Sequence, residues 1–114
     1  MKVAHTSEVA KTSVNMEGAE GVEIQWLLGK DDGTPNFAMR LFEVQPGGHT
    51  PLHAHPHEHE VFVLEGTGIV MDEGRERPIK AEDAILVPGG CEHNFQNTGD
   101  SVLRFLCLIP NSAY

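Results

Sequence analysis

Five of the seven histidines in this chain lie between His49 and His59, and an apolar stretch, residues 61–64, follows them directly. A sixth, His93, comes just after a Pro-Gly-Gly turn at residues 88–90. Imidazole is the commonest protein ligand of first-row transition metals, because it is a neutral donor at working pH. A histidine-rich tract that binds metal by composition alone would need no fold. The apolar strand that follows this one therefore predicts a folded metal site.

The rest of the chain consists of short apolar stretches separated by turn residues. We expect residues 37–44 to form a strand that ends at the turn 45–48, because proline removes a ladder donor and glycines permit a bend. Residues 61–65 and 69–71 are expected to pair as a hairpin around the turn 66–68. No segment of helical length has a sustained 3.6-residue period. The predicted fold is all-β, a sandwich, jelly roll or barrel, with further strands at 22–28, Ile79, 84–87 and 102–109.

Length and composition narrow the class of protein. A chain of 114 residues fits one domain, and we expect a polar N-terminal arm at 1–17 and a single barrel domain at 18–114. Cys91 and Cys107 are too few for a disulfide framework. The sequence also has no apolar leader and no apolar run of membrane-spanning length. Together with the two cysteines, this predicts a cytoplasmic protein without a membrane partner. The formal net charge of −9 argues against nucleic acid as a partner.

Two spaced motifs combine glycine with the histidines. One runs from Gly47 to Gly66, and the other contains the sequence 88–90, His93 and Asn97. They resemble the two signature motifs of the cupin superfamily. One departure is Glu82, at the place of the second motif's opening glycine. The resemblance implies a double-stranded β-helix, or jelly-roll barrel, with a metal near its mouth. Residues 35–42 and 105–110 also resemble small single-domain, manganese-binding cupins of prokaryotes.

The fourth ligand is either His59, which stands where the family usually has glutamate, or its neighbour Glu60. A looser count would make Glu60 the ligand. The six-residue spacing to Gly66 fits His59 only, and neighbouring strand residues face opposite sides. The small manganese cupins that the chain resembles also carry histidine there. We therefore expect a four-histidine metal site, in which the ligands are His53, His55, His59 and His93.

The remaining histidines of the cluster and the identity of the metal are less constrained. We interpret His49 and His57 as solvated or supporting side chains, because four histidines already complete the ligand set. Six-coordination would leave two open positions for a substrate or dioxygen. Imidazole ligands admit Zn, Ni, Cu or Fe, whereas the resemblance favours Mn or Fe.

Alternation along the strands predicts the wall of the pocket. Arg40 and Phe42 share a face, which makes Arg40 either the cation of the pocket or a surface residue paired with Glu43. Phe105, Cys107 and Ile109 share a face of the last strand and resemble the pocket lining of related cupins. Cys107 could equally be a small core residue. Arg40 and Cys107 are the candidate catalytic residues, and Phe42, Phe105 and Ile109 the candidate lining.

These features predict a metal-dependent oxidoreductase of dioxygenase type that acts on a small apolar or unsaturated molecule. The sequence offers no acid–base pair and no activated nucleophile, so the metal would carry the chemistry. One alternative is a non-redox isomerase or lyase, and another is a protein that only binds a small ligand through its metal. The resemblance also implies a homodimer, in which N-terminal strands pair across a two-fold axis.

Overall fold

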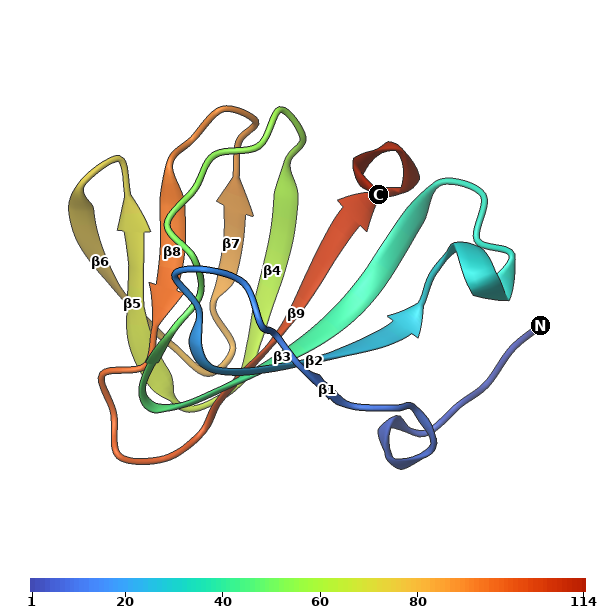
Figure 1. Ribbon diagram of the computed structural model, residues 1–114, viewed down its shortest axis with the longest axis horizontal. Helices are drawn as coiled ribbons and strands as arrows, with labels where there is room; N and C mark the ends of the chain where they lie inside the picture. The colour runs from blue at the N-terminus through green and yellow to red at the C-terminus, as the bar shows by residue number, and fades with distance from the viewer.

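A computed structural model describes residues 1–114 of the protein, in which nine strands and three single-turn 3₁₀ helices follow one another along the chain (Figure 1). The strands are β1 (Thr12–Ser13), β2 (Glu20–Leu28), β3 (Phe37–His49), β4 (His59–Glu65), β5 (Thr67–Asp72), β6 (Arg75–Lys80), β7 (Ala84–Val87), β8 (His93–Gln96) and β9 (Leu103–Pro110). The 3₁₀ helices are η1 (Thr6–Glu8), η2 (Lys30–Asp32) and η3 (Asn111–Ala113). None of these three-residue helices is long and apolar enough to cross a membrane.

All strands pair antiparallel in one curled sheet, whose main path is β6-β5-β8-β3-β9-β4-β7. Off this path, β2 pairs with β3, and β1 pairs with β2. The two ends of the main path, β6 and β7, both line one cavity. Side chains of β9 alternate between the interior and the outside, because every second residue of this strand is buried. The prediction of an all-β jelly-roll barrel is confirmed.

The inward faces of the strands fill the barrel with apolar side chains. Phe105 lies at the centre, with its ring stacked on Phe42 at 5.4 Å and tilted against Phe95 at 4.7 Å between ring centroids. This packing forms one continuous core, and its members are Val22, Ala38, Val44, Val61, Val63, Val70, Ile79, Val87, Phe95, Leu103, Phe105, Cys107 and Ile109.

Two expectations about the strands were wrong. The strand that starts at Phe37 does not end at Val44: it bulges through residues 45–48 and continues to His49, which pairs with Glu20 of β2 and Gln96 of β8. Proline and glycine are tolerated there because a bulge leaves residues outside the regular ladder.

The predicted hairpin of residues 61–65 and 69–71 does not form. β4 pairs with β7 and β9, whereas β5 pairs with β6 and β8. A single residue, Gly66, connects β4 to β5, with a positive φ of 88°. A β-carbon on Gly66 would lie 2.5 Å from the carbonyl oxygen of Val102, so the chain can turn from one side of the barrel to the other only with glycine here.

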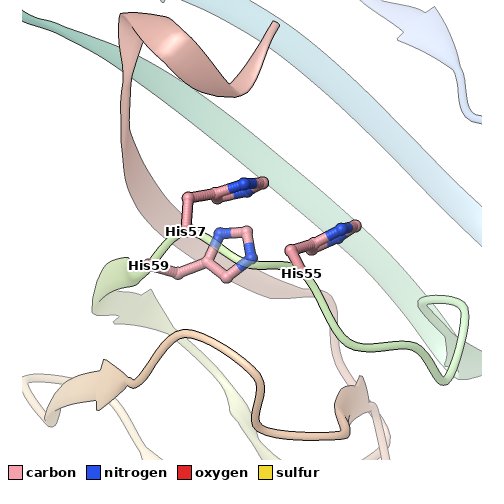
Figure 2. Close-up of side chains that lie close together, drawn as sticks. All are labelled: His55, His57 and His59. Carbon is pink, nitrogen blue, oxygen red and sulfur yellow. The ribbon is translucent and has the colours of Figure 1, made fainter.

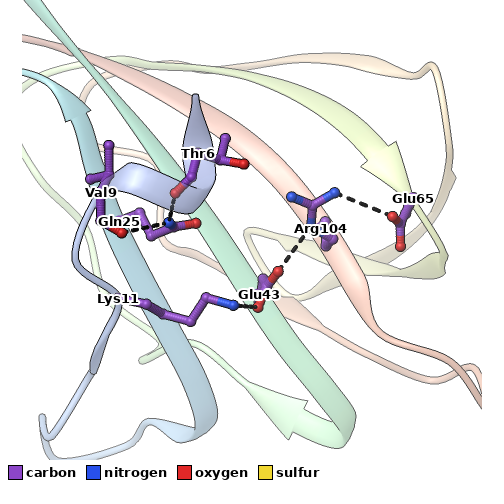
Figure 3. A network of polar contacts seen from close by, with 7 residues as sticks. All are labelled: Thr6, Val9, Lys11, Gln25, Glu43, Glu65 and Arg104. Carbon is purple, nitrogen blue, oxygen red and sulfur yellow. Dashed lines mark hydrogen bonds and ion pairs between the residues drawn. The ribbon is translucent and has the colours of Figure 1, made fainter. Parts of the chain in front are cut away.

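Residues 6–11 lie against the outer face of β2 and β3, whereas Val14 packs against the barrel core. The amide of Gln25, which is 5% exposed, donates from Nε2 to the carbonyl oxygens of Thr6 and Val9 (Figure 3). Lys11 forms an ion pair with Glu43 at 2.7 Å. In this single chain the arm thus covers its own barrel, and β1 pairs with only two residues of β2.

Candidate metal centre

The segment that leads into β4 places four histidines on the inner face of the barrel. From Pro51 to Glu60, side chains alternate strictly between the interior and solvent. His53, His55 and His57 are half-buried, and His59 is 6% exposed. Glu60 points outward and is exposed, as the choice of His59 over Glu60 requires.

β8 brings a fifth imidazole to the same place. The main chains of His53 and His93 form a two-way bridge, with N···O distances of 3.2 and 3.0 Å. The ring of His93 lies 5.1 Å from that of His59 and 5.6 Å from that of His53, between centroids. The Nε2 atoms of His53 and His55 are 2.9 Å apart. The structure therefore brings together all four predicted ligands.

His57 also belongs to this cluster, which sequence reasoning missed. Its ring stacks on His55 at 4.7 Å and lies 5.0 Å from the His59 ring (Figure 2). The ligand atoms of His55, His57 and His59 all lie within 4.8 Å of one another. The signal was present in the sequence, because His57 has the same parity as His53, His55 and His59. The bend at Pro56 does not turn the side chain away. His49 lies outside the cluster, with Nδ1 3.4 Å from the carbonyl oxygen of Thr50.

Hydrogen bonds select the nitrogens that remain free for a metal. His93 donates from Nδ1 to the carbonyl oxygen of Cys91 at 2.9 Å, which leaves the lone pair of Nε2 free. His59 Nε2 is buried and has no partner. His59 Nδ1 has two neighbours at 3.4 Å, Cys107 Sγ and Arg40 Nη2, so Nε2 is the ring nitrogen of His59 that has no contact. A buried, partnerless ring nitrogen is what a ligand position requires.

Four imidazoles of the cluster are held in the neutral, metal-binding form. Burial lowers the pKa of His59 to about 3, with Arg40 and His93 adding to the shift. Burial also lowers the pKa of His55 to about 4, followed by the effect of His53. The pKa values of His53 and His57 are lowered mainly by burial as well. Neutral imidazoles with free lone pairs fit a divalent transition metal.

Arg40 lies beside the histidines, on the inner face of β3. It is directly opposite Trp26 of β2 and Cys107 of β9, so the three side chains form one row across the sheet. Its guanidinium carbon lies 5.0 Å from the centroid of the Phe42 ring and 5.5 Å from that of Trp26. Arg40 Nη2 is 3.0 Å from Cys107 Sγ and 3.4 Å from His59 Nδ1, whereas the buried Nε has no partner.

The alternative placement of Arg40, on the surface beside Glu43, does not occur. Glu43 points to the opposite face of β3, where Lys11 and Arg104 bind its two carboxylate oxygens (Figure 3). These partners lower the pKa of Glu43. Burial raises the pKa of the Cys107 thiol against the opposing effect of Arg40. Cys107 is thus a neutral thiol that contacts both the cation and a histidine.

The histidines open into a cavity of about 460 Å³. Phe42, Phe105 and Ile109 line it, together with Arg40 and Cys107. Its outer wall comes from residues 14–16 and from Tyr114, whose ring lies 4.7 Å from that of Trp26. No aspartate or glutamate lines this cavity. A larger cavity of about 660 Å³, between β5, β6 and β7, reaches only His93 of the cluster.

The family model of the cupin domain matches residues 40–109, which is more than half of the chain. The chain belongs to the cupin superfamily. An oxalate-binding protein of Thermotoga maritima is 36% identical over 113 residues, which cover 94% of this cupin and 92% of the relative. A methylsulfurylase of Rhodospirillum rubrum, acting on 1-methylthio-D-xylulose 5-phosphate, is 38% identical over 71 residues, and these cover only 46% of that protein.

Among solved structures, this cupin is similar to the polyketide cyclase RemF of Streptomyces resistomycificus. The TM-score is 0.92 at 34% identity, over 97% of this chain and 80% of that one. A predicted oxalate decarboxylase of Thermotoga maritima superposes with a TM-score of 0.86 at 32% identity, over 96% and 98% of the two chains. The names of these relatives cover several chemistries, so the family alone does not choose a reaction.

Proposed function

We propose that this cupin is a metal-dependent oxidoreductase of dioxygenase type whose substrate is a small unsaturated molecule bound as an anion. His53, His55, His59 and His93 would hold a divalent ion, with Mn or Fe favoured. Such an ion supplies Lewis-acid and redox chemistry to ligands at its open positions.

The charge of the cavity carries this proposal. Four neutral imidazoles leave a divalent ion its full charge, and Arg40 adds a second cation in contact with His59. No carboxylate lines the cavity to compensate them. Burying uncompensated charge is costly, so an anionic ligand is favoured over a neutral one. A carboxylate, enolate or phenolate would satisfy both the ion and the free Nε of Arg40.

The remaining wall suits the unsaturated part of such a substrate. Phe42 and Phe105 are stacked beside the guanidinium, and Trp26 covers it from β2. An apolar wall excludes water and strengthens the electrostatic contacts inside the cavity. In this arrangement Arg40 orients the anion, Cys107 fixes Arg40 and His59, and the aromatic rings hold the carbon skeleton.

Activity and ligand binding together test the proposal. Protein loaded with Mn²⁺ or Fe²⁺ is assayed with and without dioxygen on small enediols, β-diketones, alkenes and aromatic carboxylates. We expect turnover that needs oxygen and favours the anionic compounds. Arg40→Gln should weaken their binding by about 10- to 100-fold, the worth of one charge-assisted contact, while Arg75→Gln at an exposed site on β6 should not. Equal turnover without oxygen would exclude the dioxygenase function.

A second candidate is non-redox metal catalysis, or ligand binding alone, directed at a small carboxylate. The observation that favours it is the oxalate-binding relative, which is similar over nearly the whole chain. Zn²⁺ should then serve as well as Mn²⁺ or Fe²⁺, because no electron need move. Tight oxalate binding without turnover under any metal would support a binding protein instead.

A further inference from the structure

His57 is the one histidine of the cavity that lies outside the predicted ligand set. The cupin motif spacing selects His53, His55 and His59 and passes over it. Nevertheless its ring faces the same cavity, stacked on His55 with an interplanar angle of 12°. Five imidazoles therefore surround one end of the cavity, one more than the motif requires.

The position of His57 is within reach of the same ion. Imidazole nitrogens bind zinc at about 2.0–2.1 Å, so two donors of one ion lie roughly 3–4 Å apart. The ligand atoms of His55, His57 and His59 are all within 4.8 Å of one another. Side-chain adjustments of about an ångström would close this group on an ion that His55 and His59 already hold.

His57 also differs from its neighbours in what holds its ring. His93 Nδ1 is fixed to a main-chain oxygen, His59 Nδ1 contacts Cys107, and His53 and His55 contact each other through Nε2. The structure gives the His57 imidazole no hydrogen bond. It lies before β4 begins, next to Pro56 in a bend, where no strand ladder fixes the main chain. The His57 ring can therefore approach the cluster or leave it without breaking a side-chain hydrogen bond.

We propose that His57 is a displaceable fifth metal donor, which occupies one open position of the four-histidine site until a chelating ligand takes that position. The inference rests on the proposed metal centre. In a six-coordinate ion, five imidazoles leave one open position and four leave two. His57 thus retains the metal in the resting protein and yields to a ligand that needs two adjacent positions.

Metal binding measured on matched variants tests this role without any activity assay. The variants are His57→Phe, which keeps a ring but removes the nitrogens, His53→Ala within the predicted ligand set, and His49→Ala outside the cluster. Co²⁺ and Mn²⁺ affinities come from competition with a chromophoric chelator, dissociation rates from a chelator chase, and coordination from the visible spectrum of the Co²⁺ protein. Oxalate serves as the bidentate probe.

The expected results separate the donor roles. Wild-type protein and His57→Phe should each hold one ion per chain, with release about tenfold faster in His57→Phe. Oxalate should change the Co²⁺ spectrum of the wild type and bind about tenfold more tightly to His57→Phe, because it no longer displaces a donor. His53→Ala should lose most of its metal, and His49→Ala should match the wild type.

Three results would overturn the inference while leaving the metal centre intact. Release and oxalate binding unchanged in His57→Phe would make His57 a bystander. Metal loss as severe as in His53→Ala would make it a permanent ligand. Two ions in the wild type and one in His57→Phe would place a second ion at His57. A wild-type protein that binds no ion would instead refute the metal centre itself.

Discussion

Gly89 packs so closely against Pro56 that a β-carbon on residue 89 would lie 2.3 Å from the Pro56 carbonyl oxygen. The next residue, Gly90, donates its main-chain N–H to the His55 carbonyl oxygen at 2.6 Å. The turn before β8 thus supports the main chain of the histidine segment from behind. Its glycines position ligands although they offer no ligand atom themselves.

We therefore predict that Gly89→Ala weakens metal binding without removing a ligand. The φ of Gly89 is not positive, so the change is steric, and the added methyl must displace the main chain beside His55 and His57. Overpacking of this kind costs about 1–3 kcal/mol of folding stability, and we expect a loss of about tenfold in Co²⁺ affinity. Both are measured by denaturant unfolding of the metal-free protein and by chelator competition.

Gly33→Ala is the matched control for this prediction. Gly33 has a φ of 86° and open space around it, and it is distant in sequence from the histidine cluster. The variant should lose about 1–2 kcal/mol from left-handed backbone strain and keep wild-type metal affinity. Equal loss of affinity in the two variants would mean that Gly89 acts only through global stability.

The faces of the strands and the positions of the histidines follow from local patterns in the sequence. Alternation placed Arg40 and Phe42 on one face of β3, and Phe105, Cys107 and Ile109 on one face of β9, because a strand has a period of two whatever it pairs with. Motif spacing likewise found the four histidines that the barrel brings together.

Pairing partners could not be predicted in the same way. The turn residues around Gly66 are typical of a hairpin, but the chain crosses there from one side of the barrel to the other. Which strand lies beside which depends on contacts far apart in the sequence, such as Trp26, Arg40 and Cys107 in one row. The cavity wall contributed by Tyr114 and residues 14–16 was missed for the same reason.

The inward position of His59 and the outward position of Glu60 predict opposite effects of two adjacent substitutions. His59→Ala should lose metal to the same extent as His53→Ala. The affinity should fall at least about 100-fold, because loss of a group that merely supports a ligand already costs about 10- to 100-fold. Glu60→Ala should keep full metal content, because its side chain is exposed on the other face of β4. Metal analysis of the three purified variants decides this. Loss in Glu60→Ala with retention in His59→Ala would reverse the assignment.

Acid should destabilise the metal-free protein over a defined range of pH. An unfolded histidine takes up its proton near pH 6.5, whereas the folded protein holds His55 and His59 neutral down to about pH 4 and about pH 3. The unfolded state therefore binds more protons below pH 6.5, and stability is lost as the pH falls toward 4. Urea midpoints measured between pH 7.5 and 4 should decline over this range, and the decline should be smaller in His59→Phe. A flat profile would show that the buried histidines are not held neutral.

Release of bound metal should depend steeply on pH. Each ligand must lose its proton to bind, so protons compete with the ion at several imidazoles at once. We expect metal release below about pH 6.5 with uptake of more than one proton per ion. Release followed with a metal indicator, together with proton uptake in weakly buffered solution, measures both quantities. Uptake of a single proton per ion would be inconsistent with a site of four histidines.

We predict that this cupin assembles as a homodimer. β1 pairs with only Glu23 and Ile24, so β2 offers further main-chain groups at its edge, and such edges tend to pair. Light scattering should give twice the 12.5 kDa mass of one chain, and a variant that begins at Gly21 should be monomeric while keeping its β-sheet circular dichroism.

A second exposed surface, Phe62, Leu64 and Leu86 on the outer face of β4 and β7, supplies the alternative interface. If Leu86→Glu dissociates the dimer and the truncation does not, the sheet face rather than the arm joins the subunits. A full-length protein that stays at 12.5 kDa at micromolar concentration would refute the dimer altogether.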